Sequence, residues 1–324
     1  MALNGPAVTK LATNDYCDKR VSDIYFTENV LLNKLMGKGG MENNFVRASE
    51  LVDGGTRIRV PLEHAKANGG SYGKNTTINA AKVDLVNAAR FRWSGEYASN
   101  TIDLEEQTQN MGDAALVDLV MTKMKNIEKT IRDNMGSKVY TAAADSDCIL
   151  GLPDLFSTVT ATTYGEIAED DMALWKANSS ANAVAISFKV LQDLCRTAQV
   201  GQSNSAKPNL IITTNTPKDG YERVLQVQQR FADVELVKAG FTNILHGGFA
   251  PVVGDDNCTS GYVMALNLRH LAMKTHKDYN FTKPVWEKDR LQPDTLTANT
   301  RWYGQLVTSH RKAHARYTGV LEPS

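Results

Sequence analysis

Two clusters of acidic residues are the first candidates for chemistry in this sequence. The carboxylates gather at Glu166, Glu169, Asp170 and Asp171, and again at Asp255 and Asp256. Such oxygens bind divalent cations or transfer protons in acid–base catalysis. Both patterns also have a structural interpretation: a polar loop anchored by Trp175 in a core, and a turn whose side chains accept hydrogen bonds from backbone amides. We favour the structural interpretation of both clusters.

The cysteines and histidines lack the spacing that metal and nucleophile sites need. The four cysteines stand at positions 17, 148, 195 and 258, and no two form a CxxC pair. The six histidines form no HExxH motif, and His310 and His314, four apart, lie in a segment with strand character. No GxSxG motif occurs, and Leu210–Tyr221 lacks the glycines and the GK[ST] ending of a phosphate-binding loop. The sequence therefore predicts reduced thiols, no metal, no cofactor and no enzymatic activity.

The composition is that of a folded protein with balanced charge. The 324 residues are 42% hydrophobic, enough for one large or two average domains. The 36 basic and 36 acidic residues argue against a dedicated nucleic-acid-binding protein and do little to oppose self-association. The sequence contains no apolar run of about 18 residues, so we predict no membrane span, and the N-terminus MALNGPAVTK lacks the pattern of a secretory signal.

The clearest predicted element is a helix from Asp113 to about Thr141. Its apolar residues recur at steps of three and four, at Leu116, Leu119, Val120, Met124, Ile127, Ile131 and Met135. Asp113 is placed as an N-cap, and Glu128 and Arg132 as an i,i+4 ion pair. At 1.5 Å per residue this helix is roughly 43 Å long, so it is either the backbone of a large domain or the strut of an elongated subunit.

Residues 56–109 are predicted to form one very long β-hairpin. RIRVPL, residues 57–62, alternates charged and apolar residues, and alternation returns around Phe91 and Trp93 after a glycine-rich stretch. Arms of about fifteen residues would reach roughly 50 Å. Because a two-stranded ribbon is marginal alone in water, a neighbouring molecule is expected to cover it. The candidate inter-subunit contacts on this loop are Arg57, Arg59, Lys66, Tyr72, Lys74, Arg90 and Arg92.

The other predicted elements form a helical N-terminus, a small α/β layer and closing strands. A helix is expected from about Thr13 to Met36, docked on a later part of the chain or on another subunit. The layer combines helices at 184–200 and from Thr216, the expected N-cap, with strands at 208–214, 234–238, 250–253 and 261–266. The C-terminal strand around Trp302 carries four basic residues that either meet nucleic acid or an acidic neighbour, or simply face solvent: Arg301, Arg311, Lys312 and Arg316.

The order of these parts resembles the major capsid proteins of tailed bacteriophages, with the Hong Kong 97-like α+β fold. The resemblance covers nearly the whole chain and rests on the order and spacing of several phrases. They include GLPDLF (151–156), TTYGEIAEDDMALWKA (162–177), PNLIITTNTPKDGYERVLQVQQRF (208–231), GFTNILHGGFAPVVGDDNC (240–258) and GYVMALNLRHLAM (261–273).

The resemblance implies a division of the chain into the parts of a shell subunit. It implies an N-arm at 1–45, peripheral-domain segments at 46–55, 110–149 (with the long spine helix) and 273–324, an extended loop at 56–109, and an α/β axial domain at 150–272. Some members carry a cross-linking lysine on this loop, where Lys66 and Lys74 lie here. The partner asparagine and the promoting glutamate match no motif, so the cross-link is not carried over.

The resemblance implies a structural protein that self-assembles from pentamers and hexamers into an icosahedral head around double-stranded DNA. The expected location is the virion, after assembly in the host bacterial cytoplasm. The expected partners are other copies of the chain, scaffolding, portal and decoration proteins, and DNA by weak non-specific contact. Two alternatives remain: an encapsulin-like cellular shell, and a cytoplasmic α/β enzyme with its site near Leu210–Tyr221 and Asp255–Asp256.

Overall fold

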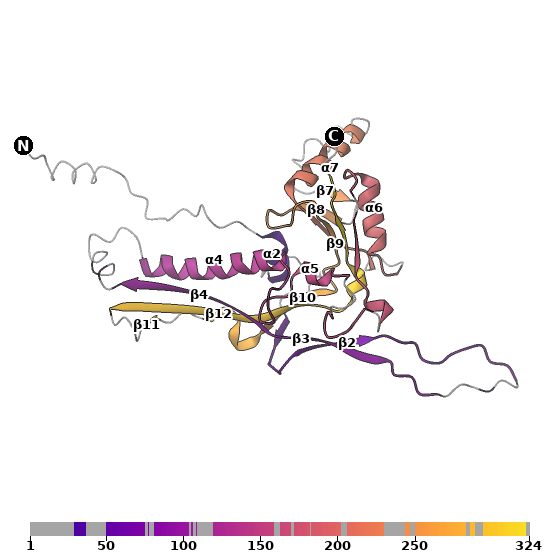
Figure 1. The fold of residues 1–324 in the computed structure, drawn as a ribbon, viewed down its shortest axis with the longest axis horizontal. Coiled ribbons are helices and arrows are strands. Elements are labelled where there is room, and N and C mark those ends of the chain that lie inside the picture. The colour runs from indigo at the N-terminus through magenta and orange to yellow at the C-terminus, as the bar shows by residue number, and fades with distance from the viewer. Residues whose placement is uncertain are drawn as a thin grey trace, which may run out of the picture. The chain divides into compact units, whose positions relative to one another are not determined.

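A computed structural model describes most of the chain (Figure 1). It describes residues 29–36, 50–74, 77, 81–103, 105, 108, 119–158, 163–169, 172–181, 183–201, 206–229, 244–246, 250–282, 286–288 and 294–321. The predicted N-cap Asp113, the strand at 234–238 and most of the helix from Thr13 lie outside these residues. Among the described residues, none of the helices is both long enough and apolar enough to cross a membrane.

The chain divides into two compact units. Unit 1 comprises Met1–Thr27, Tyr97–Asp133 and Phe281–Arg301, and unit 2 comprises Glu28–Glu96, Asn134–Asn280 and Trp302–Ser324. Three elements contribute residues to both units: helix α4 (Leu119–Val139) and strands β4 (Ser94–Asp103) and β12 (Thr295–Thr308).

Helix α4 confirms the predicted long amphipathic helix. Its described part has 21 residues, or about 32 Å at 1.5 Å per residue. Ile127, Ile131 and Met135 are buried, as the apolar stripe predicted. On its exposed side the Arg132 guanidinium lies 2.7 Å from the Glu128 carboxylate, which confirms the predicted i,i+4 pair.

Unit 1 places the first part of α4 with β4, β12 and the short strand β11 (Trp286–Lys288). β11 and β4 both pair with β12, β11 in antiparallel register with Trp286 opposite Ala298. The Lys123 ammonium donates to the Thr101 carbonyl at 2.9 Å, and the Arg132 guanidinium lies 5.6 Å from the centre of the Phe281 ring. These contacts link the helix to β4 and to Phe281, which precedes β11 in sequence.

Unit 2 contains the predicted α/β layer as a six-stranded mixed sheet. Its strand order is β5-β13-β9-β6-β8-β7. The strands are β5 (Asn178–Ala181), β6 (Leu210–Thr213), β7 (Ile244–His246), β8 (Ala250–Gly254), β9 (Val263–Leu266) and β13 (Ala315–Thr318). Every residue of β6 and β9 is buried, which matches their nearly continuous apolar sequences.

Two helices accompany this sheet, α6 (Phe188–Thr197) and α7 (Asn215–Gln229). Leu191 and Leu194 of α6 and Tyr221 of α7 pack in one core cluster with residues of the sheet. The expectation that Thr216 is the N-cap of the second helix is wrong, because the helix begins at Asn215 and Thr216 lies inside its first turn. Pro217 is therefore the third helical residue, where its missing N–H still costs no intrahelical bond.

The N-terminal helix docks within the same chain. Its described part, α2 (Val30–Met36), contacts strand β10 (Leu271–His276) and buries Leu31 and Leu35 completely. Asn29 accepts a hydrogen bond from the Leu32 amide at 2.8 Å and donates to the Gly136 carbonyl of α4 at 3.3 Å. Of the two predicted docking partners, the structure selects a later part of the chain for this segment.

Strand β10 belongs to a five-stranded sheet with the order β1-β10-β12-β11, in which β4 also pairs with β12. It pairs in parallel with β1 (Glu50–Val52) and in antiparallel register with β12. β12 confirms the predicted strand around Trp302, and its residues Trp302 and Leu306 are buried. Short segments complete the described structure: α5 (Leu152–Leu155), η2 (Ala173–Trp175), η5 (Lys277–Tyr279) and η6 (Arg311–Ala313).

The predicted single hairpin over residues 56–109 is wrong in its second half. Among the described strands, β2 (Ile58–Glu63) pairs only with β3 (Val86–Phe91), as a separate two-stranded sheet. β4 instead pairs with β12. Trp93 lies between β3, which pairs with β2, and β4, which pairs with β12. Its side chain is buried and stacks on the Tyr303 ring at 5.3 Å between ring centres. Its Nε1–H donates to the Gly55 carbonyl at 2.8 Å.

The buried side chain of His314 in unit 2 is held in its neutral form by its neighbours. The His314 Nδ1 atom accepts a hydrogen bond from the Asn267 amide at 3.2 Å, and its Nε2 atom lies 3.2 Å from the Thr308 hydroxyl. An Nδ1 atom that accepts cannot carry a proton, so the ring is neutral with its hydrogen on Nε2. Burial, together with His270 and His310, lowers the pKa of His314 to about 3.

We expect this cluster to weaken the fold in mild acid. A histidine in the unfolded chain takes up a proton near pH 6.5 while folded His314 stays neutral, so the free energy of unfolding falls by up to about 1.4 kcal/mol per pH unit below that value. Burial also lowers the pKa of His270 and His310, which adds a loss of the same sign. Urea unfolding of the subunit between pH 6.5 and 5 measures the slope, and His314→Gln should reduce it. An unchanged slope in that variant would contradict this account.

Candidate functional site

All seven candidate contact residues predicted on the extended loop are exposed. Arg57 and Arg59 lie at β2, and Arg90 and Arg92 at β3. The other three, Lys66, Tyr72 and Lys74, lie on the loop between these strands, and the Tyr72 side chain is 77% exposed. Figure 1 shows this loop leading away from the root of the hairpin.

The ribbon has an apolar face and a basic face. Ile58, Val60 and Leu62 are buried, and the residues between them are exposed, so side chains alternate as a half-buried strand requires. Arg59 is directly opposite Arg90 in the ladder. By the same alternation Arg57, Arg59, Arg90 and Arg92 lie on one side, here called the arginine face. Like charges directly opposite each other in a ladder destabilise it, so this face needs anionic partners.

A tight turn holds the root of the hairpin. The Arg90 amide donates to the Gly165 carbonyl at 2.8 Å, and the Phe91 ring meets the Tyr164 ring edge-on at 5.3 Å between centres. A Cβ atom on Gly165 would lie 3.0 Å from the Ala89 Cβ and 3.1 Å from the Phe91 ring, and Gly165 also has φ +64°. Both the close approach and the backbone conformation require glycine there.

Glu166 completes this turn at some energetic cost. Tyr164 and Ile167 form a β-bridge across Gly165 and Glu166, and Glu166 has φ +62°. Two successive positive φ angles are typical of a type I′ turn, which favours Asn, Asp and Gly, and a left-handed conformation costs other residues about 1–2 kcal/mol. The Glu166 carboxylate contacts Arg57 and lies 4.0 Å from Arg90. Such half-exposed pairs are each worth only about 0–1 kcal/mol, so they do no more than offset the strain.

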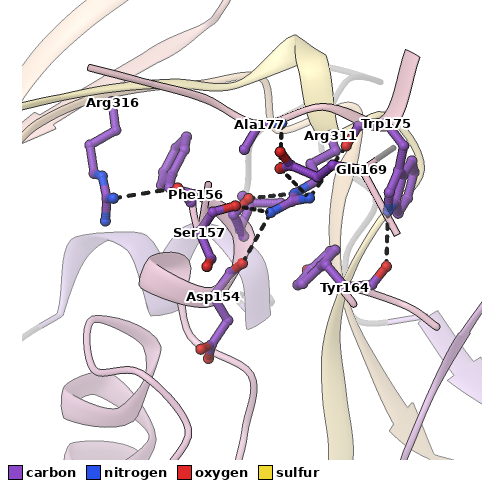
Figure 2. Close-up of polar contacts among 10 residues, drawn as sticks. Asp154, Phe156, Ser157, Tyr164, Glu169, Trp175, Ala177, Arg311 and Arg316 are labelled. Carbon is purple, nitrogen blue, oxygen red and sulfur yellow. Dashed lines mark hydrogen bonds and ion pairs between the residues drawn. The ribbon is translucent and has the colours of Figure 1, made fainter. Parts of the chain in front are cut away.

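A buried arginine fixes the segment that carries this turn (Figure 2). Arg311 of η6 is 2% exposed, and its guanidinium lies 2.8 Å from the Glu169 carboxylate and 5.1 Å from the centre of the Tyr164 ring. It also donates to the carbonyl oxygens of Leu155 at 2.7 Å and Ser157 at 2.6 Å. Burial lowers the pKa of Arg311, and the Glu169 carboxylate opposes that shift.

Glu169 and Trp175 extend the same anchor. The Ala177 amide donates to the Glu169 carboxylate at 3.1 Å, and the Trp175 Nε1–H donates to the Tyr164 carbonyl at 2.9 Å (Figure 2). Trp175 is 2% exposed, so the predicted core anchor is confirmed. Arg311, Glu169, Tyr164 and Trp175, here called the arginine anchor, join the C-terminal η6 to the loop that holds the hairpin.

The predicted basic face of the C-terminal strand does not form. Arg311 is buried in the anchor, and Arg316 is half-buried, with its guanidinium over the Phe156 and Tyr262 rings at 5.3 and 5.1 Å. Arg316 also donates to the Ser179 hydroxyl at 3.0 Å. Arg301 and Lys312 are exposed. The alternation that suggested one face is interrupted by η6, which turns Arg311 inward.

The acidic clusters form no metal site within the described residues. Glu166 and Glu169 pair with arginines, and Asp170 and Asp171 lie outside the described residues. The Asp255 carboxylate accepts from the Asn257 amide at 3.1 Å and from the Tyr140 hydroxyl at 2.9 Å. The predicted turn with a side chain bonded to a backbone amide is confirmed at Asp255.

Sequence reasoning missed the arginine anchor. The sequence pattern places Arg311 with Arg301, Lys312 and Arg316, and Glu169 with the other acids of its loop. The sequence offers one usable signal: it contains both an acid-rich loop near Trp175 and, far along the chain, a C-terminal segment with basic residues and no acid. Nothing in their spacing shows that the two are in contact, because 142 positions separate Glu169 from Arg311.

The fold is shared with known shell proteins. No protein-family model matches the chain, and no curated protein matches its sequence. The capsid of cyanophage A-1(L) superposes with a TM-score of 0.70 at 16% identity, covering 94% of this chain and 96% of that one. The capsid of the native GTA particle gives 0.64 at 11% identity, with coverage of 99% and 100%.

A third similar structure is the holo-SrpI encapsulin complex of Synechococcus elongatus. It gives a TM-score of 0.63 at 12% identity and covers 100% of this chain and 98% of the encapsulin chain. At these identities the comparisons establish the fold, and they do so over 94–100% of this chain. The chain has the α+β Hong Kong 97-like fold of these shells.

The arginine anchor should be a major determinant of subunit stability. Arg311→Met leaves the Glu169 carboxylate buried without a cation, so we expect the free energy of unfolding to fall by about 3–5 kcal/mol in urea titrations. Arg311→Met combined with Glu169→Met should recover part of that loss because neither charge is then buried. Lys312→Met, next in sequence but exposed, should change stability by less than about 0.5 kcal/mol. A double variant less stable than Arg311→Met would contradict the ion-pair account.

Proposed function

We propose that this chain is the major capsid protein of a tailed bacteriophage, which self-assembles into the icosahedral head that encloses the double-stranded DNA genome. The observation that carries the proposal is the end-to-end likeness to a cyanophage capsid subunit, with a TM-score of 0.70 and at least 94% of each chain covered. The subunit would act in the virion, after assembly in the bacterial cytoplasm, as a structural protein rather than an enzyme.

The projecting hairpin supplies the physical basis for assembly. It is a two-stranded sheet, and the side chains of the loop between its strands are mostly exposed, so this loop buries little within its own subunit. In this proposal, neighbouring copies in pentamers and hexamers cover it, and repetition by symmetry multiplies small contacts into a stable shell. Residues 1–45 serve as the N-arm, 150–272 as the axial domain, and 46–55, 110–149 and 273–324 as the peripheral domain.

Six exposed basic residues and one exposed tyrosine are the proposed inter-subunit contacts. On the ribbon they are Arg57, Arg59, Arg90 and Arg92, and on the loop Lys66, Tyr72 and Lys74. The correction to the hairpin shortens the extended loop to about residues 57–92, because β4 pairs with β12. Scaffolding, portal and decoration proteins are further expected partners, and packaged DNA makes weak non-specific contacts.

An encapsulin-like cellular shell is the second candidate, favoured by the match that covers 100% of this chain. The enzyme alternative is the least favoured, because the hydrogen bonds of Asp255 to Asn257 and Tyr140 and of Asp256 to Asn215 give both carboxylates a structural role. The contents of the particles separate the two shell functions.

Expression of the chain should yield closed shells or rings in negative-stain electron micrographs. Particles purified from phage-producing cells should contain nuclease-protected DNA. Particles that instead contain one packaged protein and no DNA would support the encapsulin-like alternative. A subunit that stays monomeric at high concentration, with no rings or shells, would contradict both.

Deletion of residues 65–76 should impair assembly while leaving the subunit folded, since the described residues of this stretch lie on the loop and add nothing to the buried core. Thermal unfolding and circular dichroism of the isolated subunit should match the wild type, and the yield of shells should fall. A Gly/Ser replacement of equal length is the control: it keeps the reach of the loop but removes Lys66, Tyr72 and Lys74. Loss of a soluble fold in the deletion would show that the loop belongs to the core.

A further inference from the structure

Glu166 occupies a position whose backbone conformation disfavours its side chain. It has φ +62°, next to Gly165 at φ +64°, in the turn that contacts the root of the hairpin. Among the described non-glycine residues only Phe281 shares a positive φ. Because the strain and the half-exposed ion pairs of Glu166 nearly cancel, stability of the subunit gives no reason for a glutamate at this position.

The contacts of Glu166 are placed to fix the direction of the hairpin, rather than to stabilise the fold. Its carboxylate contacts Arg57, just before β2, and lies 4.0 Å from Arg90 in β3. One side chain therefore reaches both strands of the ribbon. The turn that carries Glu166 is itself attached to the arginine anchor through Tyr164, whose carbonyl accepts from Trp175 and whose ring lies under Arg311.

The ribbon needs such control at its root. It is a two-stranded sheet without a third strand, so its angle depends on the packing of its buried apolar face and on the contacts at its root. The six-residue ladder is about 20 Å long at 3.3 Å per residue, and a tilt of about 10° at the root moves its far end by about 3.5 Å. A displacement of that size exceeds the length of a hydrogen bond, so contacts made by the loop with another molecule would be lost.

We propose that Glu166 is a positioning residue for shell assembly, which fixes the direction of the β2–β3 hairpin by pairing with Arg57 and Arg90 from a strained turn. The proposal rests on the assembly function proposed above. It assigns Glu166 a role that is separable from folding, since its removal relieves strain in the subunit. It also neutralises part of the arginine face, where Arg59 and Arg90 are directly opposite.

The test compares three substitutions with different effects on charge and backbone. Glu166→Asn removes the charge and suits the left-handed backbone, Glu166→Gly removes both charge and strain, and Glu166→Asp keeps the charge and suits the turn. We expect the Asn and Gly variants to unfold at the same temperature as the wild type or higher, yet to give about fivefold fewer regular shells at equal subunit concentration, a factor that corresponds to about 1 kcal/mol. Glu166→Asp should retain more assembly than Glu166→Asn.

Two further measurements separate the hairpin from the rest of assembly. Raising the salt concentration should bring wild-type assembly closer to that of Glu166→Asn, because exposed ion pairs are screened. Spin labels at Ser71→Cys on the loop and Ala144→Cys on the body, with the four native cysteines replaced by alanine, report the hairpin's direction in the isolated subunit. The distance distribution should broaden in Glu166→Asn.

The outcomes are decisive in both directions. Normal shell yields and unchanged spin-label distances in Glu166→Asn would overturn the proposal, and so would a loss of subunit stability in Glu166→Gly, which would make the role structural. If the wild-type chain forms no shells, the proposed function fails. The spin-label measurement then still decides whether Glu166 orients the hairpin.

Discussion

The structure depends on one buried charge, the guanidinium of Arg311. An arginine taken out of water must have every donor matched, and here a carboxylate and several backbone carbonyls surround it. These partners lie far from Arg311 in sequence, at residues 154–157 and at Glu169 and Trp175. Ser157 and Glu169 lie outside the helices and strands. The ion pair with Glu169 and the hydrogen bonds of Arg311 therefore fix backbone that is not held by a helix or a strand.

The arginine anchor also explains how the root of a two-stranded ribbon is held in a defined position. Phe91 and Arg90 contact Tyr164 and Gly165, and these residues are held by Trp175 and Arg311. Burial thus decreases outward, from a buried ion pair, through a turn that requires glycine, to a half-exposed ion pair and an exposed loop. Such a gradient would suit the proposed shell subunit, because the fold is stabilised inside while contacts made by the loop would be individually weak.

The sequence predicts what depends on local periodicity and misses what depends on partners. The stripe of α4, the buried strands β6 and β9 and the anchoring of Trp175 follow from spacing and composition alone. The period of two in residues 94–103 predicts a strand correctly, but it carries no information on the neighbour, so β4 was assigned to the wrong ladder. Arg311 was misplaced for a related reason: burial of a charge depends on a distant acid, and adjacent Lys312 shows that local sequence does not separate the two cases.

The balance of charge in the whole chain matters because the arginine face of the hairpin is locally basic. With 36 basic and 36 acidic residues, a copy has no net charge to repel another copy, yet the arginine face concentrates cations where the hairpin leaves the body. A neutral chain with a local excess of one sign must carry the opposite excess elsewhere. Two copies can therefore attract each other through different patches while having no long-range repulsion to overcome. In the proposed shell, such a heterologous contact would close into rings where the rotation allows it.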